Sequence, residues 1–114
     1  MDKDKIYLQH ILEAIQKIES YTAGHTEGTF SNDDLVSDAV VREIEIIGEA
    51  ARNMSDELKQ TNREIVWRDV TDMRNFLTHE YFKVDRHVVW NTITKDLPVM
   101  REEVKRLLKE LHSN

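Results

Sequence analysis

Apolar residues recur at intervals of three and four along most of the chain, the spacing of amphipathic helices. The first such stripe lies within about residues 4–21 and comprises Leu8, Ile11, Leu12, Ile15 and Ile18. A polar stretch with two glycines, 22–29, interrupts it. A second stripe follows, made of Val36, Val40, Ile44, Ile47, Ala51 and Met54. We therefore expect two long helices, each with one buried face.

Residues that favour helix N-termini mark the expected starts of several helices. Ser31 is the predicted N-cap of the second helix, with Asp33 and Asp34 in its first turn, where the helix dipole favours negative charge. Ser55 begins a short helical turn that reaches about Lys59. Asp85 is the predicted N-cap of a later helix whose inward residues are Val89, Ile93 and Leu97.

Two further segments complete the expected fold. A third long helix is predicted over about 66–79, with Val66, Val70, Met73 and Leu77 on one stripe. Pro98 indicates a kink or restart, since proline fits only the first turn of a helix. The last helix carries Met100, Val104, Leu107, Leu108 and Leu111. The pattern predicts one all-α domain over 1–114, an antiparallel up-and-down bundle of four main helices with short accessory ones.

Composition narrows the classes of function. The chain has 114 residues, no cysteine and a formal net charge of −6. Cysteine nucleophiles, disulfides and cysteine zinc sites are excluded. No apolar run is long enough for a membrane span, so the cytoplasm is the expected compartment. An acidic chain argues against a broad basic nucleic-acid surface and leaves room only for a local site. The acidic residues Glu43, Glu45 and Glu49 are expected to form an exposed helix face.

The residues best suited to take part in a reaction lie in the segment 74–81, Arg-Asn-Phe-Leu-Thr-His-Glu-Tyr. The Arg74 guanidinium can hold a phosphate with paired N–H donors. The His79 imidazole can transfer a proton near neutral pH. The Tyr81 hydroxyl can be modified. This combination points to chemistry on a phosphodiester, or to regulation by phosphate.

Helical geometry suggests how these side chains are arranged. At roughly 100° per residue, Asn75 and His79 lie together, about 150° or more from the apolar stripe of the same helix. Asn75 can therefore hydrogen-bond the ring of His79 and fix its tautomer. Because His79 points away from its own core, we expect that only a second subunit encloses it. A two-fold dimer would place two histidines and two arginines in one pocket.

Simpler interpretations of these residues also fit the spacing. An Arg–His pair on a helix is most often a solvated face, and tyrosine is most often a rim residue with a wet hydroxyl. Aromatic residues elsewhere, such as Trp67 and Trp90, are expected to be core or interface anchors. No metal is predicted, because the His79-Glu80 pair lacks a second histidine. The remaining histidines show no ligand spacing either: His10, His25, His87 and His112.

Several blocks in order resemble the HepT-like branch of the HEPN-domain ribonucleases. Segment 73–82 resembles the R-x4-H-x-Y signature of that branch, and 42–51 (REIEIIGEAA) is similar to its "IGEA" segment. Segment 66–70 (VWRDV) resembles its lead-in to the motif, and 88–90 (VVW) followed by 96–98 (DLP) resembles its closing helices. The resemblance spans about residues 4–111.

The resemblance implies a homodimeric HEPN-like bundle and a metal-independent ribonuclease toxin that needs no cofactor. It implies that Arg74 and His79 are the catalytic pair and that Asn75 supports them. It also implies a partner, a nucleotidyltransferase antitoxin of the MntA type that transfers AMP from ATP to Tyr81. Two alternatives remain open from the residues: a non-catalytic helical adaptor that binds nucleotide or the nucleotidyltransferase, and a plain dimeric bundle without a site.

Overall fold

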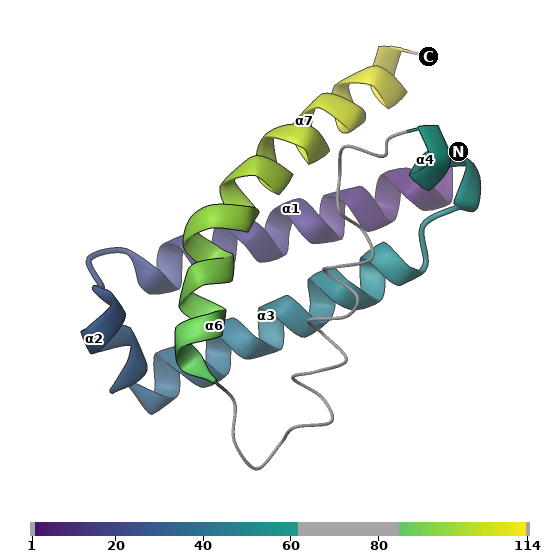
Figure 1. The fold of residues 1–114 in the computed structure, drawn as a ribbon. Helices are drawn as coiled ribbons and strands as arrows, with labels where there is room; N and C mark the ends of the chain where they lie inside the picture. Colours follow the sequence, from purple (N-terminus) through teal and green to yellow (C-terminus); the bar gives the residue numbers. More distant parts are fainter. Residues whose placement is uncertain (1, 62–84, 114) are drawn as a thin grey trace.

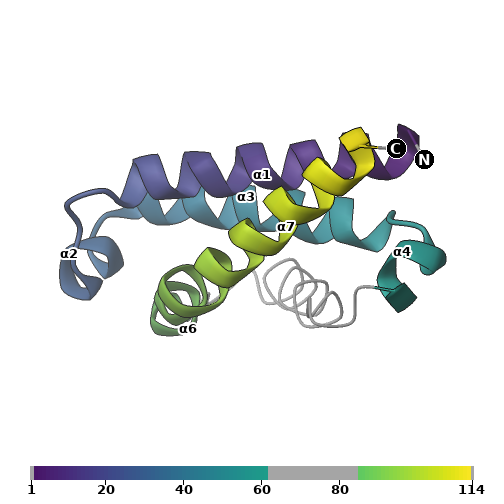
Figure 2. The same cartoon turned by 90° about the horizontal axis from the view of Figure 1, so that it is seen from above.

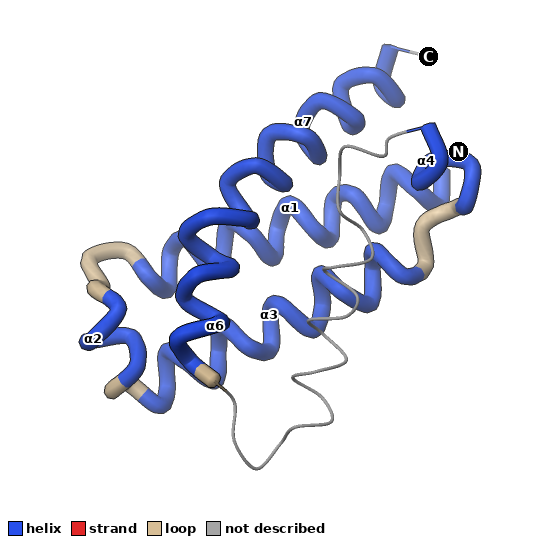
Figure 3. Tube along the Cα trace, in the orientation of Figure 1, coloured by secondary structure: helices blue, strands red, loops and turns tan. Residues whose placement is uncertain are grey.

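The computed structural model describes residues 2–61 and 85–113, which form helices joined by short turns (Figure 1; Figure 3). No strand occurs in these two ranges. Helices α1 (Asp2–Thr22) and α3 (Asp34–Arg52) run antiparallel in one layer, and α7 (Leu97–Ser113) crosses them in a second layer (Figure 1; Figure 2). The predicted all-α bundle is therefore confirmed. The helix expected over about 66–79 lies outside the described residues.

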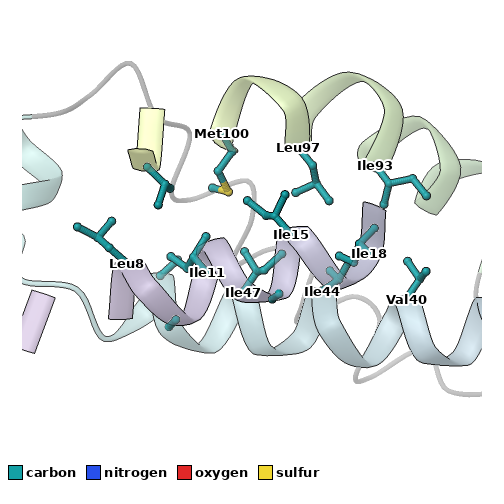
Figure 4. Packing of buried hydrophobic residues seen from close by; sticks show 14 of the residues in the cluster. Leu8, Ile11, Ile15, Ile18, Val40, Ile44, Ile47, Ile93, Leu97 and Met100 are labelled. Carbon is teal, nitrogen blue, oxygen red and sulfur yellow. The ribbon is translucent and has the colours of Figure 1, made fainter. Parts of the chain in front are cut away.

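The core forms where the predicted apolar stripes meet. Figure 4 shows Leu97 and Met100 pointing from α7 toward α1, where Ile15 lies above Ile47 of α3. The residues of the two first stripes are buried as expected, except that Leu12 and Val36 are only half-buried. Burying one aliphatic side chain of this size contributes about 1.5–3 kcal/mol. Apolar burial shared by α1, α3 and α7 therefore stabilises the described part of the fold.

The connection between α1 and α3 differs from its prediction. Gly24 adopts a left-handed conformation (φ 81°) that ends α1, and a short helix, α2 (Glu27–Ser31), follows. Thr26 caps α2 through reciprocal bonds with Thr29. The prediction that Ser31 caps the second long helix is wrong. Ser31 ends α2 instead, and Asp33 caps α3 by accepting the Val36 N–H at 3.0 Å.

After α3 the chain forms a short helix and then a continuous helical arm made of α6, η1 and α7. Ser55 precedes the short helix α4 (Asp56–Thr61), and after the segment 62–84 the chain enters α6 (Arg86–Asn91). A π-helical turn, η1 (Thr92–Asp96), joins α6 directly to α7. Pro98 lies in the first turn of α7, as predicted for a restart. Since proline lacks an N–H and clashes with the carbonyl four residues before it, the wider π turn is a natural junction here.

The expected exposed acidic face of α3 is only partly present. Glu43 is buried, with 7% of its surface exposed, so the prediction that it lies on an exposed helix face is wrong. It lies roughly 60° from the centre of the stripe around Val40, inside the broad arc that α3 buries. Glu45 is half-buried and Glu49 is exposed. None of the helices over 2–61 and 85–113 combines the length and apolar character of a membrane span.

Candidate functional site

The four predicted site residues, Arg74, Asn75, His79 and Tyr81, all lie in the segment 62–84, outside the described residues. The predicted orientation of His79 and its support by Asn75 therefore stay predictions. What the structure does describe is the pair of attachment points for this segment. It follows α4 at one end and precedes α6 at the other. Both attachment points carry polar contacts between parts of the chain that are far apart in sequence.

The attachment at α4 is held by a buried carboxylate. Asp4, 1% exposed on α1, accepts the Ser55 backbone N–H at 2.8 Å and the Ser55 hydroxyl at 2.6 Å. The Ser55 hydroxyl oxygen in turn accepts the Leu58 N–H at 3.2 Å, as an N-cap of α4 does. Bonds to a buried carboxylate are strong, and a donor left without it is costly. The start of α4 is therefore fixed to the N-terminal turn of α1.

The attachment at α6 is held by its first residues. Asp85 caps the helix by accepting the His87 and Val88 N–H groups at 3.0 and 3.3 Å, as predicted. The Arg86 guanidinium donates to the Ser31 carbonyl oxygen at 2.5 Å and to the Asp34 carboxylate at 2.8 Å. One side chain thus links α6 to the end of α2 and the start of α3.

A second charged contact reinforces this attachment. The His87 Nδ1 donates to the Glu27 carboxylate of α2, and the Asn91 amide lies 3.3 Å from the other ring nitrogen. The hydrogen bond and charge of Glu27 raise the pKa of the His87 imidazole, with a smaller contribution from Asp85. Lys95 opposes this by lowering the same pKa. The protonated form of His87 is therefore the one that the pair favours.

An aromatic contact lies beside these polar ones. The ring of Phe30, which is fully buried on α2, lies 5.2 Å from the ring of Trp90 at a tilt of 39°. The expectation that Trp90 anchors the fold is confirmed, since it packs half-buried against the core. Aromatic pairs of this kind add about 0.5–1.5 kcal/mol beyond their buried area. The region immediately after the predicted motif is therefore attached by charge and by packing.

Sequence reasoning missed the contacts made by Arg86 and His87. Their partners are 52 to 60 residues away, and no local spacing signals such pairs. Within residues 2–61 and 85–113 no group of three or more histidine or acidic side chains could hold a metal ion. The prediction of no metal at His79 concerns residues outside these ranges and stays a prediction.

Comparison with known proteins identifies the family of this chain. A family model described as "Ribonuclease HepT-like" matches residues 11–107, which include both attachment points and the predicted motif. The chain belongs to the HepT-like ribonuclease family. The resemblance drawn from the sequence blocks is thereby confirmed at the level of the family.

Relatives of this HepT-like chain carry ribonuclease names. A Thermococcus cleftensis protein named "Probable ribonuclease HepT" is 40% identical over 92% of this chain and 96% of its own. A Caldanaerobacter subterraneus protein named "Putative RNase" is 34% identical over 96% of this chain and 98% of its own.

A Methanocaldococcus jannaschii protein named "Gamma-glutamylcyclotransferase and putative RNase" is 44% identical over all of this chain. The HepT-like chain spans about half of that relative, 52%. No solved structure matches the chain significantly.

Proposed function

We propose that this HepT-like chain is a metal-independent endoribonuclease toxin of a toxin–antitoxin pair. The observation that carries the proposal is the family match over residues 11–107, because it spans the whole R-x4-H-x-Y segment from Arg74 to Tyr81. Relatives named as ribonucleases support RNA as the substrate. The proposed compartment is the cytoplasm.

The proposed mechanism uses two protein side chains and no metal. In a homodimer cleft, one His79 imidazole takes the proton from a ribose 2′-OH, and the 2′-oxygen attacks the adjacent phosphorus. The bond from phosphorus to the 5′-oxygen breaks, and that oxygen receives a proton from the second His79. Arg74 holds the phosphate and stabilises the charge of the transition state. Asn75 fixes the His79 tautomer. The products are a 2′,3′-cyclic phosphate and a free 5′-hydroxyl.

The proposed control is covalent. A nucleotidyltransferase antitoxin of the MntA type transfers AMP from ATP to the Tyr81 hydroxyl and releases pyrophosphate. The added group is bulky and negatively charged, so it excludes RNA from the cleft by sterics and by repulsion. Tyr81 lies four residues before Asp85 in the sequence, next to the attachment held by Arg86 and His87. Such an attachment suits a segment whose side chains have to keep a defined position.

The decisive experiment is cleavage of a single-stranded RNA by the purified, unmodified protein in excess EDTA. We expect cleavage with cyclic-phosphate ends, and a loss of about a hundredfold or more in His79→Ala, the usual range for a general acid or base. Arg74→Lys serves as the matched variant, since it keeps the charge but loses the paired donors. Equal cleavage by wild type and His79→Ala would refute the proposed catalytic role.

The regulatory half of the proposal has its own test. After incubation with an MntA-type enzyme and ATP, intact mass should rise by one or more AMP units, and Tyr81→Phe should abolish the rise. Binding of the nucleotidyltransferase without RNA cleavage by any form of the chain would favour the adaptor instead.

A further inference from the structure

One flank of α1 combines basic and aromatic side chains. Positions at helical spacing place Lys3, Tyr7, His10, Lys17 and Tyr21 within about 80° of the helix circumference, with the buried Ala14 between His10 and Lys17. We call these five residues the α1 strip. Tyr7 is half-buried and the other four are exposed, Tyr21 to 38%. From Lys3 to Tyr21 the strip extends about 27 Å along the axis.

The side chains at one end of the strip already contact one another. The Lys3 ammonium lies 5.8 Å from the centre of the Tyr7 ring, within cation–π range. The Tyr7 and His10 rings meet edge to face, with centroids 6.2 Å apart. These contacts keep a cation and two rings together on one surface.

The lysines of the strip form no ion pairs with carboxylates of the described residues, unlike the arginines of α7. On α7, Arg101 pairs with Glu19 at 2.7 Å, and Arg106 pairs with Glu103 and Glu110 at 2.8 Å. Among the described residues, no carboxylate forms an ion pair with Lys3 or Lys17.

Acidic side chains lie mostly outside this flank. Glu19 points about 160° away from the strip, toward α7. Glu43 on the adjacent α3 is buried, and Asp4 is buried against Ser55. Glu13 borders the strip without lying within it. The strip therefore carries two lysine charges without an ion pair among the described residues and one bordering carboxylate, Glu13, which lies four positions before Lys17, on a chain whose net charge is −6.

We propose that the α1 strip binds single-stranded RNA through residues other than the proposed catalytic pair, Arg74 and His79. Exposed lysines attract phosphates along one strand, and exposed rings such as Tyr21 offer stacking surfaces that accept any base. The choice of RNA over other polyanions rests on the proposed ribonuclease function. An acidic protein surface is the competing occupant, and the experiment separates the two.

The test is fluorescence anisotropy with a labelled 2′-O-methyl oligouridine of about 12 nucleotides, within the range of single-strand sites. This RNA cannot form the 2′-alkoxide, so binding is measured without cleavage. The double variant Lys3→Gln/Lys17→Gln should bind about fivefold to tenfold more weakly. Its salt dependence, the slope of log K against log salt, should fall by about 1.4, because two phosphate contacts are lost. Tyr21→Ala should weaken binding by about fivefold or more.

The matched control is Lys95→Gln/Lys105→Gln, which removes the same charge from η1 and α7. Retained affinity in the control supports the proposal, provided that circular dichroism melting shows every variant folded. An equal loss in both double variants, or no binding by wild type, would overturn it. So would unchanged RNA binding accompanied by lost self-association in sedimentation, since the strip would then contact protein. Strip-dependent binding without cleavage of ordinary RNA would instead remove the proposed ribonuclease function and leave this inference standing.

Discussion

The α1–α3 pair and the arm formed by α6, η1 and α7 are attached to the same core by different means. The pair is joined by aliphatic residues along both helices, and its N-terminal end is fixed by the buried Asp4–Ser55 contact. The arm also buries apolar residues. Its polar attachments are the exposed ion pairs of His87 and Arg101 and the partly buried hydrogen bond from Arg86 to the Ser31 carbonyl oxygen. Buried contacts are costly to break and exposed ones are not. The comparison therefore predicts that the packing of the pair is costly to disturb and that the exposed ion pairs of the arm, made by His87 and Arg101, can be changed at little cost.

The largest effect expected from this comparison is loss of apolar packing in the pair. Ile15 is fully buried at the meeting point of α1, α3 and α7 (Figure 4). Ile15→Ala should lower the free energy of unfolding by about 4 kcal/mol, through lost transfer energy and the cavity left behind. Urea denaturation followed by circular dichroism measures this. The matched control is Val99→Ala on the arm, which is 62% exposed and should change stability by less than about 0.5 kcal/mol. Similar costs at both positions would contradict the packing described above.

The next effect concerns the polar contact of the pair. Asp4→Ala should cost about 2–3 kcal/mol, because the Ser55 N–H and hydroxyl lose their buried acceptor. Asp4→Asn keeps one amide oxygen as an acceptor and should cost less. Hydrogen exchange of the α4 amides provides a local readout, and protection there should fall in Asp4→Ala. A cost below about 0.5 kcal/mol for Asp4→Ala would place this contact in the same class as the exposed ion pairs of the arm.

The same two regions show what could be predicted from the sequence. Apolar stripes with helical period predicted both long helices, because burial of one face imposes that period directly. The start of α3 was misplaced, since Ser31 and Asp33 are both good N-caps and the choice depends on the short helix α2 between them. Glu43 was expected to be exposed because a carboxylate ordinarily is, yet its position lies inside the buried arc.

Contacts between distant segments could not be predicted in this way. Arg86 and Asp34 are 52 residues apart, and the packing of α6 against α2, which precedes α3, brings them together. The predicted site consists of residues of the R-x4-H-x-Y segment, whose residue types indicate proton transfer and phosphate binding. Its arrangement depends on the placement of residues 62–84 and, in the proposed homodimer, on a second subunit, neither of which helical spacing determines.

A smaller effect is expected at the ion pair between the arm and α1. The side chains of Arg101 and Glu19 are each more than a third exposed, at 35% and 43%, so solvent screens their attraction. The double-mutant cycle of Arg101→Gln and Glu19→Gln should give a coupling energy of about 0.5 kcal/mol, and 1 M salt should reduce it. Thermal or urea unfolding of the four proteins supplies the cycle. A coupling of about 2 kcal/mol or more would mean that the arm, like the pair, is held by strong polar contacts.

The smallest effect on stability, but the most specific one, belongs to His87. Its pKa is raised in the folded chain by Glu27, so the pair stabilises the fold fully below the unfolded histidine pKa of about 6.5. That stabilisation is lost as pH rises through the folded pKa. Proton–nitrogen NMR titration should place the folded pKa above 6.5, and Glu27→Gln should move it down toward that value. The matched control Asp34→Asn removes a carboxylate that pairs with Arg86 instead and should leave the His87 titration nearly in place. If Glu27→Gln left the titration unchanged, the attachment of α6 to α2 would rest on Arg86 and on the Phe30–Trp90 packing alone.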